Sequence, residues 1–234
     1  MTEWVRHRPS DLRAINYDAS AAGRLAGLLR AATAAGIPVE PCGANQLAAL
    51  VGAARHQGVV ATAAPFPYAT LEEIVTSRPN LLVVADQMQD PQNLGALLRT
   101  AAAVGSGAVI LPKDGAVGVT AVVEAAAAGA AALLPVCRVT NVERSLRTLK
   151  ESGYWVWGLV PRQGVDLFHA DPPQPLVMVV GGESGMRALV GKRCDALVSI
   201  PMWGRVESLN AAVATAIALY HVRRQWGGLT EAVR

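Results

Sequence analysis

Residues 81–111, LLVVADQMQDPQNLGALLRTAAAVGSGAVIL, contain a strand, a helix and a second strand in close succession. The first five residues are continuously apolar and end at Asp86, and residues 108–111 are apolar again. Between them, leucine and alanine recur at helical spacing over residues 94–104. Continuous apolar strands that alternate with helices are typical of a parallel sheet covered on both faces, so this stretch predicts the α/β class.

The same alternation continues to residue 225. Further strands are predicted at 133–139, 155–160, 175–182 and 196–201. Further helices are predicted at 119–128, 142–152, 186–192 and 209–225. In open sheets of this kind ligands bind beyond the carboxyl ends of the strands, so candidate site residues are expected directly after strands.

The N-terminal part is predicted to be a smaller α/β domain. Its strands and helices are expected at 12–18, 21–36, 37–42, 45–58 and 59–64. The proline-containing segments PFPY and TSRPN then interrupt regular structure. We therefore predict two domains, 1–64 and 80–234, joined by a linker at 65–79.

Composition argues against several classes of protein. No clean apolar stretch of about 20 residues is present, and the first residues lack the apolar region of a signal peptide. A cytoplasmic protein without a membrane partner is therefore expected. The three cysteines and four histidines show no ligand spacing, so neither a metal site nor a disulfide framework is expected.

The charge pattern is compatible with RNA but does not require it. The formal net charge is +3, and of the 21 basic residues three are lysine and eighteen are arginine. Arginine forms forked contacts with phosphate and stacks on bases. A mild basic excess is also common in proteins that bind no nucleic acid.

The first candidate corner follows the predicted strand at 81–86. Asn93 precedes an apolar helix and is predicted to be its N-cap. Gly95 weakens the first turn and indicates a close approach by another group. Arg99 lies at the edge of the apolar stripe, and its side chain can reach back toward the strand end. The alternative is a capped helix that carries a snorkelling arginine.

The second corner is VMVVGGESGMR, residues 177–187. Gly181 and Gly182 end a buried strand and permit a tight turn with close backbone approach. Glu183 follows them, where an acid can cap amides or hold a ligand; an ordinary strand–helix turn is the alternative. No G-x-G-x-x-G follows the first strand, so a dinucleotide site is not predicted.

The third corner is SIPMWGRVESLNAAVATAI, residues 199–217. Ser208 is predicted to cap the helix that follows. Helix capping explains why a serine stands at position 208, but it does not explain why a polar residue also stands at position 210, as Asn210. This corner is therefore predicted to start a helix, and the residues alone leave the role of Asn210 open.

In their order and spacing, the three corners resemble the motifs of the SpoU/TrmH group of SPOUT RNA ribose 2′-O-methyltransferases. DPQNLGALLRTAAAVG resembles the first motif, VVGGESGM the second and IPMWGRVESLNAAVATAI the third. HQGVVATAAP, residues 56–65, is similar to part of the L30e-like RNA-binding domain of the bacterial branch. That branch methylates a guanosine of 23S ribosomal RNA, which the resemblance makes the expected target.

The resemblance implies a parallel-sheet SPOUT domain with a deep C-terminal trefoil knot, preceded by a small L30e-like α/β domain. It also implies S-adenosyl-L-methionine as cofactor, RNA as partner and a homodimer. The positions that match the cofactor pocket are Gly181, Gly182, Ile200, Met202 and Leu209. The positions that match catalytic residues are Asn93, Arg99, Glu183, Ser208 and Asn210. RNA contacts are implied for Arg99, His56 and Gln57, with helix-end packing as the alternative for the last two.

The family gives its motif-one arginine, here Arg99, a part in removing the 2′-hydroxyl proton. Arginine has a pKa above about 12 and rarely releases its proton. We therefore interpret Arg99 as a charged fork on the nucleotide's phosphate. Ser208 and Asn210 are expected to orient the ribose, while Glu183 and Asn93 hold the corner in register.

Two features depart from the family pattern. The second motif usually reads Gly-x-Glu-x-x-Gly, and here it is one residue shorter. The usual opening strand and helix with Gly-x-x-x-Val are not found in MTEWVRHRPSDLR, so a truncated or divergent start of the first domain is expected. The alternatives are the same chemistry on transfer RNA or another ribosomal site, and a non-catalytic RNA-binding factor of ribosome assembly.

Overall fold

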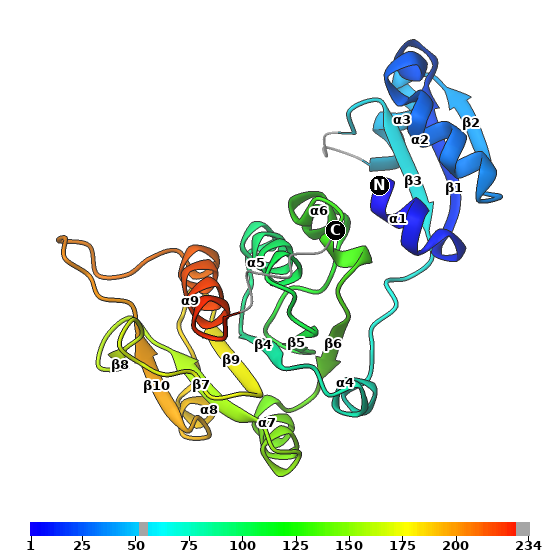
Figure 1. Ribbon diagram of the computed structural model, residues 1–234. Helices are drawn as coiled ribbons and strands as arrows, with labels where there is room; N and C mark the ends of the chain where they lie inside the picture. The colour runs from blue at the N-terminus through cyan, green and yellow to red at the C-terminus, as the bar shows by residue number, and fades with distance from the viewer. Residues whose placement is uncertain (52–55, 228–234) are drawn as a thin grey trace. The chain divides into compact units, whose positions relative to one another are not determined.

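Two compact units make up the protein, Met1–Pro67 and Tyr68–Arg234. The computed structural model describes residues 1–51 and 56–227 of them. The first unit, blue to cyan in Figure 1, is built on a three-stranded sheet in the order β2-β1-β3. In it, β1 pairs in parallel with β2 and antiparallel with β3. Its elements are α1 (Thr2–His7), β1 (Leu12–Asp18), α2 (Ala22–Ala34), β2 (Val39–Cys42), α3 (Ala44–Val51) and β3 (Val59–Ala63), with 3-10 turns at Pro9–Asp11 and Ala19–Ala21.

An apolar cluster lies in the described part of the first unit. Its buried members are Val5, Leu12, Ile15, Ala32 and Ile37. They come from α1, β1, α2 and the approach to β2, so both helices cover the sheet. The helix α1 was not predicted, because six residues are too few to show a helical period.

The predicted helix at 45–58 differs from the structure. The helix α3 spans Ala44–Val51, and residues 52–55 lie outside the described residues. The residues that follow form a turn, in which Gln57 has φ 50° and Gly58 φ 84°. Positive φ is incompatible with a continuing right-handed helix.

The second unit contains a sheet of seven strands within the described residues, in the order β6-β5-β4-β9-β7-β10-β8. Every pair of neighbours is parallel, as the sequence predicts. The strands are β4 (Leu81–Asp86), β5 (Ala108–Pro112), β6 (Val136–Val139), β7 (Trp155–Leu159), β8 (Val165–Asp166), β9 (Leu176–Gly181) and β10 (Ala196–Ser199). The helices are α4 (Leu71–Ser77), α5 (Pro91–Ala103), α6 (Ala121–Ala127), α7 (Val142–Glu151), α8 (Ala188–Gly191) and α9 (Ala211–Gln225), with a 3-10 turn at Ala130–Ala132.

Helices cover both faces of this sheet. Figure 1 shows α5 and α9 on one side and α4, α7 and α8 on the other. Every residue of the central strands β4 and β9 is buried, which explains their continuous apolar sequences. None of the helices in residues 1–51 and 56–227 is long and apolar enough to cross a membrane.

The structure places a helix inside the range predicted as a linker, 65–79. The helix α4 begins at a capping box, in which Thr70 accepts from the Glu73 amide and Glu73 accepts from the Thr70 amide. Ile74 of this helix is buried in the core of the second unit. A threonine followed three residues later by glutamate is the sequence signal that identifies such a start.

The close approach predicted at Gly95 is made by another helix and not by a ligand. A Cβ built on Gly95 would lie 2.3 Å from the Cβ of Ala126 and 2.8 Å from the carbonyl oxygen of Val123. Both belong to α6. Glycine therefore lets α5 and α6 pack closely, and this sets the position of α5 on the sheet.

Candidate active site

A cavity of about 770 Å³ lies at the carboxyl ends of β7, β9 and β10. Its wall is mainly apolar and includes Leu159, Val160, Val180, Leu197, Ile200 and Leu209. The charged side chains on the wall are Glu183, Arg187 and Lys192. Nine of the predicted site residues line it: Asn93, Gly181, Gly182, Glu183, Ile200, Met202, Ser208, Leu209 and Asn210. Because parallel strands end at one edge, the three corners meet there.

A chain of hydrogen bonds connects the three corners. Asn93 Nδ2 donates to Glu183 Oε1 at 2.7 Å, and Asn210 Nδ2 donates to Asn93 Oδ1 at 2.8 Å. The other carboxylate oxygen, Glu183 Oε2, accepts from the amide of Gln89 at 3.2 Å. We call these three side chains the Asn–Glu–Asn network. Its members are 90 and 117 residues apart in the chain, so only the folded sheet brings them together.

The network favours the ionised form of Glu183. Burial raises the pKa of Glu183, but the hydrogen bonds from Asn93 and from backbone amides outweigh it, and the pKa lies below its ordinary value of 4.5. A carboxylate with a lowered pKa contributes stability above its unfolded pKa and loses it as the pH falls through the folded pKa.

Glu183→Gln is therefore expected to be less stable than the unmodified protein at pH 7. As the pH falls below 4.5 the difference is expected to shrink, and it is lost once the pH has passed the lowered pKa at which the carboxylate of the folded protein is protonated too. Urea denaturation from pH 7 to pH 3 measures both stabilities. A difference that stays constant over this range would show that ionisation of Glu183 contributes nothing.

The helix caps differ from the predicted ones. The N-cap of α5 is Asp90, whose side chain accepts from the Gln92 amide, and Pro91 follows at the first helical position. Asn93 therefore lies inside the first turn. The N-cap of α9 is Asn210 and not Ser208, since Asn210 Oδ1 accepts from the amides of the second and third helical residues. Proline at the first helical position is a known start signal.

Asn210 thus has two separable functions, a helix cap and a network donor. Asn210→Ala is expected to lower the free energy of unfolding by about 1 kcal/mol through loss of the cap. Asn210→Ser retains a capping oxygen but not the amide that donates to Asn93. We expect the serine variant to recover most of the stability and little of the activity. Equal recovery of both would show that capping is the only function.

The two glycines of the second corner bring backbone segments together. A Cβ on Gly181 would lie 2.2 Å from the amide nitrogen of Met186, and one on Gly182 would lie 2.2 Å from the carbonyl oxygen of Gln87. Neither position has room for a side chain. The predicted close backbone approach is confirmed, and it closes the loop between β9 and α8 against itself and against the end of β4.

An ion pair next to this loop was not predicted. Asp86, completely buried at the end of β4, accepts from Arg187 Nε at 2.9 Å, from the Arg187 amide at 2.9 Å, and from Arg187 Nη2. Arg187 also lines the cavity. An aspartate at the end of an apolar strand was the only signal, and its partner is 101 residues away. The pair fixes the second corner onto β4.

Two family models match this chain. The model of the SpoU rRNA Methylase family matches residues 80–220. The chain belongs to this family. A second model, described as RNA 2'-O ribose methyltransferase substrate binding, matches residues 2–69.

Similar proteins agree with the SpoU assignment. The 23S rRNA (guanosine-2'-O-)-methyltransferase RlmB of Ralstonia nicotianae is 43% identical over 230 residues, which is 96% of this chain and 92% of that protein. The protein of the same description from Bordetella pertussis is 43% identical over 96% of this chain and 94% of its own length.

Solved structures show the same fold. The SpoU methyltransferase AviRb from Streptomyces viridochromogenes, in complex with the cofactor AdoMet, has a TM-score of 0.79 at 27% identity and covers 96% of this chain and 86% of its own. The AdoMet-bound rRNA methyltransferase from Sinorhizobium meliloti has a TM-score of 0.76 at 25% identity, over 92% and 80% of the two chains.

Three predicted site residues of this SpoU protein lie outside the cavity. Arg99 is exposed on α5 and is not among the lining residues. His56 and Gln57 belong to the first unit, where His56 Nδ1 accepts from the Gly58 amide at 3.1 Å and the Gln57 carbonyl accepts from Arg24 at 2.8 Å. These bonds stabilise the turn, which agrees with a structural role as the alternative to an RNA contact. The RNA contacts of His56 and Gln57 stay predictions.

Burial disfavours the thiolate form of two cysteines of this SpoU protein. Burial raises the pKa of Cys137 to about 11 and that of Cys194 to about 12, so both thiols stay protonated at neutral pH. Within residues 1–51 and 56–227, no three histidine, cysteine, aspartate or glutamate side chains gather as ligands.

Proposed function

We propose that this protein transfers a methyl group from S-adenosyl-L-methionine to the ribose 2′-hydroxyl of a guanosine in 23S ribosomal RNA. One observation carries the proposal: the Asn–Glu–Asn network borders a cavity of about 770 Å³ in a chain of the SpoU family. Relatives that are 43% identical over 96% of the chain are named for this activity.

The cavity fits the cofactor. Its volume of about 770 Å³ lies in the range of small-molecule sites, roughly 300–1,000 Å³. Its apolar wall suits an adenosine, and two basic side chains, Arg187 and Lys192, border it. The residues that would hold the cofactor are Gly181, Gly182, Ile200, Met202 and Leu209. When bound, S-adenosyl-L-methionine supplies a methyl group already activated on a sulfonium, so no metal is needed.

The protein's own residues then have to place the ribose. The amide oxygen and amide nitrogen of Asn210 are already bonded, to the helix and to Asn93. Ser208 is exposed, lines the cavity and forms no hydrogen bond with residues 1–51 and 56–227. We therefore assign the direct contact with the ribose to Ser208. The network anchors Asn210, two residues after Ser208, at the start of α9.

Arg99 is proposed to act on the substrate phosphate and not on the cofactor. It is exposed on the same helix as Asn93. A guanidinium bound to the phosphate beside the reacting ribose would lower the pKa of the hydroxyl and let its proton pass to a phosphate oxygen. Positioning of the two reactants supplies most of the remaining rate enhancement.

The domain roles and the knot are further parts of the proposal. Residues 1–64 are assigned to an L30e-like domain that binds the RNA, and residues 80–234, together with the helix α4 that packs on their core, to the SPOUT methyltransferase domain. The match of residues 2–69 to a substrate-binding model supports the first assignment.

A trefoil knot is supported by β9, which inserts between β4 and β7, and by α9, which returns to pack on α5 and β9.

A homodimer is proposed for the active form. The proposed location is the cytoplasm, where ribosomal RNA is located. Two large apolar side chains of α9, Val213 and Tyr220, are 49% and 51% exposed. Such side chains on one helix are available to a second copy of the chain. Analytical ultracentrifugation tests this assignment.

The test of function is methyl transfer from labelled S-adenosyl-L-methionine to unmodified 23S ribosomal RNA and, in parallel, to transfer RNA. The product is digested and its nucleosides are identified. Label in 2′-O-methylguanosine from ribosomal RNA alone is the expected result. Label in transfer RNA alone would retain the chemistry and change the target. Cofactor binding without any transfer would favour the non-catalytic alternative.

A further inference from the structure

The loop between β10 and α9 carries an unusually exposed tryptophan. Trp203 is 87% exposed, more than the other exposed large apolar side chains of residues 1–51 and 56–227. In Figure 1 this loop, in orange, projects away from the sheet. The neighbouring Val206 is 61% exposed. An indole in this position has lost most of the burial that ordinarily stabilises tryptophan.

Both ends of this loop form part of the cavity wall. Ile200 and Met202 line the cavity on one side of Trp203, and Ser208 and Leu209 line it on the other. The indole is therefore one residue from a cavity-lining side chain. The loop therefore lies at the border of the cavity.

Arginines accompany the indole. Arg205 is exposed two residues after Trp203. Arg162, which follows the cavity-lining Pro161, reaches the same loop and lies 3.8 Å from Glu207. The side chains of Arg162 and Glu207 are 67% and 86% exposed, so their ion pair is weak and open to exchange with a phosphate.

We propose that Trp203 is a stacking platform for a base of the RNA substrate, adjacent to the nucleotide whose ribose enters the cavity. In the same proposal, Arg205 and Arg162 bind the phosphates on either side of that base. The proposal rests on the proposed function, because it requires RNA at the cavity. An unstacked base on an aromatic side chain, with guanidinium groups on the backbone, is the usual way in which proteins bind single-stranded RNA.

Chemistry favours RNA over a protein at this loop. The centre of a protein interface is depleted of charged residues, whereas the loop that carries this indole also carries Arg205 and Glu207, and Arg162 lies 3.8 Å from Glu207. A 2′-hydroxyl inside folded RNA also has to be displayed before it can react. Stacking on Trp203 would replace the stacking energy that the displayed nucleotide and its neighbours lose.

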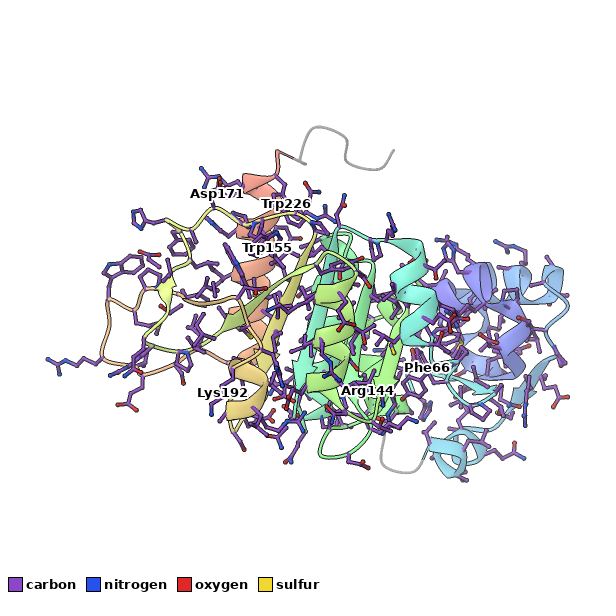
Figure 2. All side chains as sticks on the ribbon, turned by 90° about the horizontal axis from the view of Figure 1, so that it is seen from below. Phe66, Arg144, Trp155, Asp171, Lys192 and Trp226 are labelled. Atoms are coloured by element: carbon purple, nitrogen blue, oxygen red, sulfur yellow. The ribbon has the colours of Figure 1, made fainter. Side chains whose placement is uncertain are left out.

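The test compares Trp203→Ala with Trp203→Phe and with Trp155→Ala as a matched control. Trp155 is 52% exposed but begins β7, at the end of the strand away from the cavity. Figure 2 shows it at the same end of the second unit as Asp171 and Trp226. Affinity is measured with an unmodified 23S ribosomal RNA transcript, and S-adenosyl-L-methionine affinity is measured separately.

For Trp203→Ala the dissociation constant for RNA is expected to rise about 5- to 100-fold, in the range of a single base–aromatic stack. Trp203→Phe is expected to stay within a few-fold of the unmodified protein, and Trp155→Ala to be unchanged. Cofactor affinity should be unchanged in all three. Arg205→Gln should weaken RNA binding and reduce the slope of log affinity against log salt by about 1.

A second readout separates this proposal from the proposed function. Stacking quenches indole fluorescence, so single-stranded RNA oligonucleotides should quench the unmodified protein more than Trp203→Phe. Unchanged RNA affinity in Trp203→Ala, together with equal quenching of the unmodified protein and Trp203→Phe, would overturn the platform, whatever the enzyme activity. Lack of methyl transfer to any RNA, with the quenching difference intact, would overturn the function and not the platform. Loss of self-association in Trp203→Ala, with RNA affinity unchanged, would assign the loop to a second copy.

Discussion

Arg187→Met is expected to lower the free energy of unfolding by about 3 kcal/mol, since removing one partner of a buried ion pair typically costs 3–5 kcal/mol. Asp86 is completely buried and accepts two side-chain hydrogen bonds from Arg187. Without the guanidinium its charge is unpaired in the core. The lower end of the range applies because the Arg187 side chain is 40% exposed, so solvent already screens part of the ion pair. Urea denaturation followed by circular dichroism measures the change.

Arg193→Met is the matched control. Arg193 pairs with Glu143 in a similar geometry, but the two side chains are 48% and 29% exposed. We expect a loss below about 1 kcal/mol there. Adding Asp86→Asn to Arg187→Met should restore part of the stability by removing the buried charge. Equal losses in the two arginine variants would show that burial of Asp86 is not the cause.

Arg99→Ala is expected to abolish methyl transfer, a fall of at least about 100-fold, as for the loss of one positioned donor to a reacting group. Affinity for S-adenosyl-L-methionine is expected to stay within a few-fold, because Arg99 does not line the cavity. Single-turnover transfer at saturating cofactor measures the first quantity, and calorimetry measures the second.

Arg147→Ala on α7 controls for the loss of one positive charge, since Arg147 is exposed on a helix on the opposite face of the sheet from α5. It should leave transfer unchanged. Normal turnover in Arg99→Ala would remove Arg99 from the mechanism. A large loss of cofactor affinity would instead make it a residue of the cofactor site.

Local sequence signals predicted elements better than they predicted roles at element ends. The strand at residues 12–18 was predicted with the bounds of β1. Two caps were assigned to the wrong residue, Asn93 and Ser208. Each helix start offers two residues that cap helices well, Asp90 and Asn93 for α5, and Ser208 and Asn210 for α9. Which residue of a pair is the N-cap depends on where the helix axis meets the sheet. The strand β8, only two residues long, lies in a segment that was predicted to be a loop.

The sequence by itself determined the class of fold and nine of the residues that line the cavity. Apolar runs that alternate with helices require a parallel sheet covered on both faces, and residues directly after such strands must meet at one edge. The polar corners at Asn93, Glu183 and Asn210 could therefore be expected to lie close together before any coordinates were known.

Only the tertiary structure decided the order of the strands and the partners of the polar groups. Because β9 inserts between β4 and β7, Asp86 lies opposite Gly181 and pairs with Arg187. The same insertion joins Asn93 to Glu183, 90 residues later. Hydrophobic periodicity is a property of neighbours in the chain. Hydrogen bonds and ion pairs between distant corners depend on which strands are adjacent, and that order is set by packing of the whole sheet.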